Sequence, residues 1–138
     1  FNTLAGPAVK SSEGKWLSAG SPADLQAVLD AIDGTVPQDG TGLYAAFAVS
    51  RTLSPKPDNI LLVTDGLPTR GRTEPVGSTV SAEQRLKHFY QAVKKLPEQI
   101  PVNTILLPME GDAYAAAAFW KLAQETRGSF LTPARDWP

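Results

Sequence analysis

The sequence has no cysteine, no excess of charge of either sign and no long apolar run. Without cysteine, a disulfide scaffold, a thiolate zinc site and a thiol nucleophile are all excluded. Thirteen Lys and Arg face fourteen Asp and Glu, so a formal charge of -1 gives no overall field to attract nucleic acid or an anionic membrane. No apolar stretch approaches the roughly 20 residues of a spanning helix. We therefore expect no nucleic-acid partner and no membrane insertion by this segment.

What is present fits one folded domain. The 138 residues are 42% hydrophobic and 20% charged, values typical of an ordinary globular chain. The chain opens at Phe1 instead of Met and closes at Pro138 without a polar tail, and we interpret both ends as cuts through a longer polypeptide. The expectation is a single partial domain over residues 1–138.

Four segments have the apolar spacing and end signals of helices. In the first, Ser21 can cap the helix and Pro22 suits its first turn. Its apolar residues recur at the spacing of a stripe laid on a core: Leu25, Val28, Leu29 and Ile32. The other segments are residues 42–53, residues 81–96 with a capping box at Ser81, and residues 113–127 with Gly128 placed to close the helix.

Three segments are predicted as strands: residues 59–64, 102–107 and 129–131. The first two are short apolar runs, which are typical of strands buried on both faces of a parallel sheet. Alternating strands and helices imply right-handed crossovers. The expected fold is α/β: a three-layer, doubly wound, mostly parallel, Rossmann-like sheet with helices on both faces, incomplete at the N-terminus.

Ligands of an open parallel sheet bind beyond the carboxyl ends of its strands, and Asp65 stands at such an end. Asp65 is therefore a candidate ligand, or else a turn former ahead of Gly66. Thr41 lies between Gly40 and Gly42 before a predicted helix, where its hydroxyl can cap the helix or face the same rim. The residues alone leave both alternatives open.

Several of these segments resemble the von Willebrand factor A family. The first two matching motifs are Gly40–Ala46 and Asn59–Pro68, which contains the Thr-Asp-Gly sequence at 64–66. Val102–Leu106 and Phe119–Phe130 resemble the late strand and last helix of that family.

The resemblance implies a metal-ion-dependent adhesion site rather than an enzyme. In the family, an Asp-x-Ser-x-Ser loop, a Thr and a later Asp hold Mg²⁺ or Mn²⁺, and Thr41 and Asp65 match the latter two. Gly40, Gly42 and Gly66 would shape the loops around them. The cation would bridge to an exposed carboxylate of a partner protein. The compartment stays open, with the family slightly favouring an extracytoplasmic or membrane-tethered setting.

One family motif is missing, because no aspartate here begins an Asp-x-Ser-x-Ser run. Phe1–Thr3 resembles the second strand of the family, so the missing piece would be the first strand, that loop and the first helix. A divalent cation needs about six oxygen ligands. We therefore expect Mg²⁺ to bind this fragment weakly or not at all. In the family the missing first strand lies at the centre of the sheet, between the strands at Phe1 and Ile60. Its loss would leave strand edges unpaired unless those two strands pair with each other.

The segment from Gly66 to Val80 has no helical or strand period and is predicted as a surface loop. This loop begins at the same edge of the predicted sheet as Asp65. Arg70 and Arg72 therefore either contact an acidic partner beside the metal or are simply solvated.

Two other functions compete with adhesion. A phosphatase of the haloacid dehalogenase type needs a nucleophilic Asp where this chain has Val63, and the single histidine, His88, is predicted to face solvent. The domain could also serve as an assembly subunit that works with an AAA-type ATPase without metal-dependent adhesion. The residues do not separate that role from adhesion.

Overall fold

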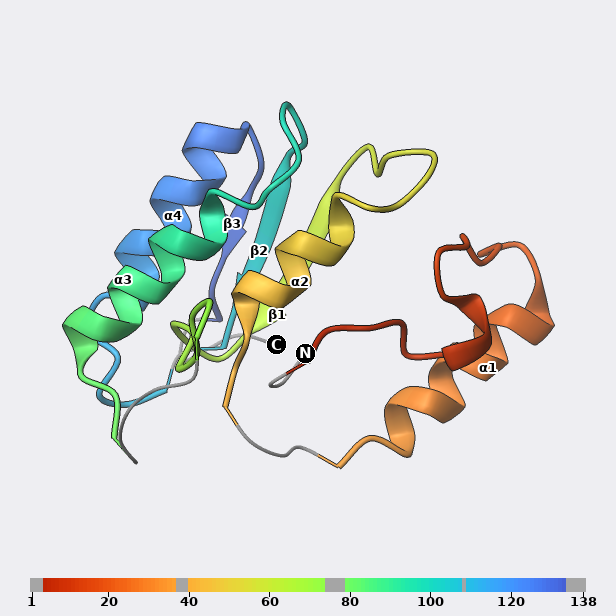
Figure 1. Cartoon of the computed structure of the whole chain (residues 1–138), viewed down its shortest axis with the longest axis horizontal. Helices are drawn as coiled ribbons and strands as arrows, with labels where there is room; N and C mark the ends of the chain where they lie inside the picture. Colours follow the sequence, from red (N-terminus) through yellow and green to blue (C-terminus); the bar gives the residue numbers. More distant parts are fainter. Residues whose placement is uncertain (1–3, 37–39, 74–78, 108, 134–138) are drawn as a thin grey trace.

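A three-stranded parallel sheet forms the centre of the protein. The structure, a computed structural model, describes residues 4–36, 40–73, 79–107 and 109–133. The strands are β1 (Ile60–Thr64), β2 (Val102–Leu106) and β3 (Phe130–Leu131), in the order β1-β2-β3. All neighbours are parallel (Figure 1). The predicted α/β class and all three predicted strands are confirmed.

The described residues contain four α-helices and one short 3₁₀ turn. They are η1 (Lys10–Ser12), α1 (Pro22–Asp33), α2 (Leu43–Ser50), α3 (Ala82–Val93) and α4 (Ala115–Thr126). All four predicted helices are present: α2, α3 and α4 fall within their predicted segments with shorter ends, and α1 extends one residue beyond its predicted end at Ile32. In the described part of the chain, no helix has both the length and the apolar character needed to cross a membrane.

The predicted start signals of α1 and α3 are confirmed. The Ser21 hydroxyl accepts the backbone N–H of Asp24, and Ser81 with Gln84 forms a capping box. Beside this box, a backbone hydrogen bond and the Ser81 hydroxyl lower the pKa of Glu83. Each cap satisfies amide groups that the first turn of a helix leaves unpaired.

Helices α2, α3 and α4 pack together on one face of the sheet (Figure 1). Leu62 and Thr104, which are paired across β1 and β2, are both buried on this face, and Leu62 belongs to a core cluster with three buried phenylalanines. These are Phe47 of α2, Phe89 of α3 and Phe119 of α4. The ring centroids of Phe89 and Phe119 lie 5.0 Å apart, edge to face, an arrangement that aromatic pairs prefer.

The opposite face of the sheet is apolar and open. Leu61 and Val63 are 65% and 52% exposed, and Leu131 lies on the same face of β3. The prediction that the strand at residues 59–64 is buried on both faces is therefore wrong. Because the strands follow in sequential order, right-handed crossovers place α3 and α4 on one face, and helices on the other face require the strand order to reverse. The expected second helical layer is not seen in the described residues.

Helix α1 lies apart from the sheet (Figure 1). Its apolar residues Leu25, Leu29 and Ile32 are all exposed, so the prediction that this stripe packs on a core is wrong. The 3.6-residue period shows that a helix is amphipathic, but it does not show that another element lies against it. Phe1–Thr3, predicted as the second strand of the family, lies outside the described residues.

The end of α4 differs from its prediction in one residue. Arg127, rather than Gly128, adopts the left-handed conformation that closes the helix, with a φ of 61°. Gly128 is needed for another reason, because a Cβ at this position would overlap the carbonyl of Val102. Glycine therefore allows the end of α4 to lie directly on the start of β2.

Candidate functional site

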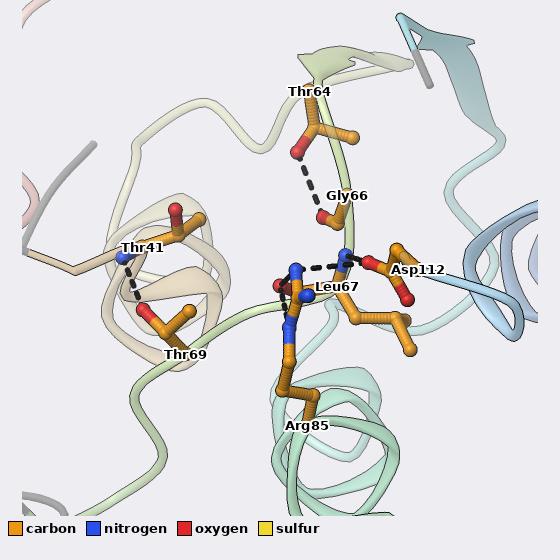
Figure 2. Close-up of polar contacts among 7 residues, drawn as sticks. All are labelled: Thr41, Thr64, Gly66, Leu67, Thr69, Arg85 and Asp112. Carbon is orange, nitrogen blue, oxygen red and sulfur yellow. Dashed lines mark hydrogen bonds and ion pairs between the residues drawn. The ribbon is translucent and has the colours of Figure 1, made fainter. Parts of the chain in front are cut away.

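Asp65 stands at the carboxyl edge of the sheet, immediately after the last residue of β1. Its side chain is exposed, and among the described residues no hydrogen bond or ion pair involves its carboxylate. The local turn is instead closed by Thr64, whose hydroxyl donates to the carbonyl of Gly66 over 3.1 Å (Figure 2). The structure therefore does not show the turn-forming role considered for Asp65.

Thr41 lies at the start of α2 but does not cap it. The cap position is Gly42, and no side chain hydrogen-bonds the free amides there. The backbone of Thr41 instead contacts the loop after β1: its N–H donates to Thr69 Oγ1 over 2.9 Å (Figure 2). Its carbonyl accepts the N–H of Arg70 over 3.1 Å. Within the described chain, the Thr41 hydroxyl has no hydrogen-bond partner.

Two of the predicted glycines mark close approaches in this region. A Cβ at Gly40 would lie 2.5 Å from Thr69 Oγ1 and 3.2 Å from Cγ of Arg70. A Cβ at Gly66 would lie 2.6 Å from Oδ2 of Asp112. Only glycine leaves room for these side chains against the backbone.

The two loop arginines differ in their surroundings. Arg70 is half-buried, and its side chain lies along Gly40, next to the Thr41 segment. Arg72 is exposed. Of the two, Arg70 is thus the one that the structure brings beside the predicted site residues.

His88 is not the surface residue that helical spacing predicted. It is half-buried, and its Nδ1 is buried without a hydrogen-bond partner among the described residues. The loop at Gly71 covers it, since a Cβ at Gly71 would overlap the imidazole. Helical spacing measures angle on one helix and does not register a loop folded over it.

Three residues that the sequence did not single out hold this edge of the sheet: Thr69, Arg85 and Asp112. Oδ2 of Asp112 accepts the N–H of Leu67 over 2.6 Å and lies 2.8 Å from Nη2 of Arg85. Arg85 in turn donates from Nε and Nη2 to the carbonyl of Leu67, over 3.0 and 2.6 Å. Of these residues, Asp112 could have been suspected from its position in the sequence. It follows β2, and the carboxyl ends of parallel strands lie at one edge of the sheet.

The oxygen groups at this edge suit a hard divalent cation in type but not in number. The Thr41 hydroxyl and the Asp65 carboxylate are both oxygen donors, whereas Mg²⁺ or Ca²⁺ takes about six oxygens. Oδ2 of Asp112, another carboxylate oxygen at this edge, is already engaged by Arg85 and Leu67. In the ranges that the structure describes, no cluster of three or more acidic or histidine residues is placed to hold a metal.

No family model matches this chain, and no curated protein or solved structure matches it. The fold itself is α/β, with a small open parallel sheet and four helices among the described residues. This architecture is compatible with a Rossmann-like fold.

Proposed function

We propose that this chain is part of a metal-ion-dependent protein-binding domain of the von Willebrand factor A type. Thr41 and Asp65 would contribute oxygen ligands to a divalent cation at the carboxyl edge of the sheet. One observation carries the proposal. Two oxygen groups from distant segments adjoin the same loop, and neither is used in the hydrogen bonding of the described residues.

The open side of β1 supports the same domain type. β1 pairs with β2 on one side only among the described strands, and its outward face carries exposed Leu61 and Val63. If the family's first strand lay directly beside β1 and its second strand lay beyond the first, the strand order would reverse at that point. The crossover between those two strands would then place a helix over this apolar face. Asp65 would then stand at a topological switch point, where ligands of such sheets bind.

The cation would act as a bridge. Held by Thr41 and Asp65 and by ligands from outside these residues, it would leave a position for a carboxylate oxygen of the partner protein. Arg70, which lies beside Thr41, would add positive charge next to that carboxylate. Such a bridge would serve either adhesion or metal-dependent assembly of a larger complex, so the proposal covers both of these roles.

Two residues, Val63 and His88, are the reason why we propose binding rather than catalysis. A phosphoryl-transfer site of the aspartate type requires a nucleophile at the position of Val63, an alkyl side chain that points to the open face of the sheet. The imidazole of His88 is covered by the loop at Gly71. Neither residue supplies a base or a nucleophile at the edge where Asp65 stands.

Calorimetry with Mn²⁺ on the polypeptide that contains this sequence tests the proposal. Asp65→Ala and Thr41→Ala should each weaken Mn²⁺ binding, Asp65→Ala by at least about 10-fold, since it removes a charged ligand. Asp58→Ala is the matched control, because Asp58 is an exposed aspartate at the other end of β1. It should leave the affinity unchanged.

The proposal also predicts a difference between the long polypeptide and the isolated residues 1–138. The isolated segment should bind Mn²⁺ weakly or not at all, since two protein oxygens are far fewer than the ion requires. Equal affinity of Asp65→Ala and wild type, or tight binding by the isolated segment, would overturn the proposed site.

A further inference from the structure

Leu67, two residues after Asp65, has both of its backbone polar groups held by charged side chains. Asp112, from the segment between β2 and α4, accepts its N–H, while Arg85 of α3 donates twice to its carbonyl (Figure 2). The two side chains also pair with each other at 2.8 Å. We call these contacts the Leu67 clamp.

Stability alone does not explain the clamp. The Asp112 side chain is 1% exposed and that of Arg85 is 15% exposed, so both charges have lost most of their hydration. A buried ion pair is often no more stabilising than apolar residues of the same volume. Oδ1 of Asp112 is also buried without a hydrogen-bond partner among the described residues, which adds to the cost. What the pair supplies is geometry, because charge-assisted bonds at these distances are strong and directional.

The geometry that it fixes includes the backbone of Asp65. On the upstream side, Thr64 O accepts the N–H of Leu107 over 2.8 Å, and Asp65 O accepts that of Met109 over 3.2 Å. On the downstream side, Asp112 holds Leu67. The backbone from 64 to 67 is therefore tied along its length to the segment that follows β2.

We infer that Asp112 and Arg85 are positioning residues, which set the place of the Asp65 carboxylate through the backbone of Leu67. The inference deepens the proposed function and rests on it for the metal readout. It also assigns a role to Gly66, where a Cβ would come within 2.6 Å of Asp112 Oδ2 and 3.0 Å of Arg85 Nη2. The clamp closes over position 66 only because that position has no side chain.

The test measures backbone order and Mn²⁺ affinity in the same variants of the metal-binding polypeptide. Asp112→Asn keeps the size of the side chain but removes the charge opposite Arg85. Arg85→Lys keeps the charge but loses the planar fork that reaches Leu67. In both variants the amide order parameters of Asp65 to Leu67 should fall from about 0.85 toward 0.6. Mn²⁺ affinity should fall by about 10-fold, as for other residues that orient metal ligands.

Leu122→Ala is the control for a merely structural effect. Leu122 is buried on α4 and belongs to the hydrophobic core, so its loss lowers global stability without removing a contact of the clamp. This variant should keep wild-type order at Asp65 to Leu67 and wild-type Mn²⁺ affinity.

Two results would overturn the inference: unchanged order in both clamp variants, or reduced order with wild-type Mn²⁺ affinity. The same loss of affinity in Leu122→Ala would also overturn it. If the wild-type protein itself binds no Mn²⁺, the proposed function fails, and the order parameters still decide whether the clamp holds the Asp65 backbone.

Discussion

The described residues of 40–133 and of 4–36 form helices from the same kinds of local sequence signals, but only the helices of the first region bury their apolar stripes. Helix α4 begins after a turn, has an apolar stripe and buries it, with Leu122 only 1% exposed. Helix α1 has a capping serine, a proline in its first turn and an apolar stripe of the same period, yet Leu29 is 48% exposed. Local signals suffice to form a helix, but burial requires a second surface.

This difference in burial indicates which region contributes most of the stability of the fold. The core joins α2, α3, α4 and one face of the sheet in one cluster. In contrast, α1 has no buried residue. A bond that ties the N-terminal region to the rest runs from Trp16 Nε1 to the carbonyl of Pro55, over 2.9 Å. We therefore expect mutations to act very differently in the two regions.

The largest contrast is expected from the same substitution in two helices. Leu122→Ala should lower the free energy of unfolding by about 2–5 kcal/mol, because it removes buried methyl groups and leaves a cavity. Leu29→Ala should change it by less than about 0.5 kcal/mol, as for most surface substitutions. Urea unfolding of both variants measures the pair. If both variants lost the same free energy of unfolding, α1 would be packed against other residues in solution, and the contrast between the two regions would be wrong.

A smaller contrast is expected between two glycines. Gly128→Ala should cost about 1–3 kcal/mol or more, since the new methyl group overlaps the backbone of Val102 and forces α4 away from β2. Gly20→Ala is the control, because the nearest atom to its Cβ would be Ser18 Oγ at 3.8 Å. Its melting temperature should match the wild type. A stable Gly128→Ala would show that the contact with β2 relaxes easily.

The smallest effect is expected at the link between the regions. Trp16→Phe removes the indole N–H that donates to Pro55 and should cost about 0.5–1 kcal/mol, because the bond is exposed to water. Limited proteolysis should cut α1 faster in this variant while the fragments of the core remain intact. An unchanged cleavage rate would mean that the Trp16 contact does not hold the N-terminal region in place.

The candidate site shows the same division between local and tertiary information. The sequence indicated Asp65 and Thr41, because a strand ending in Thr-Asp-Gly and a glycine-flanked threonine are local patterns. It did not single out Arg85 or Asp112, because the position of Asp112 after β2 does not reveal its pairing with Arg85, which lies far away in the chain. Nothing local distinguishes these two charges from solvated ones, because burial by other elements creates the difference.

The amino-acid sequence by itself determined the helices, the strands and their parallel α/β arrangement, since caps, periods and turn residues act over a few neighbouring positions. Only the tertiary structure decided which apolar faces are buried. The stripe of α1 and the outer face of β1 satisfied every local rule for a core, and both are exposed. Burial is a property of two surfaces in contact, and a periodic pattern describes only one of them.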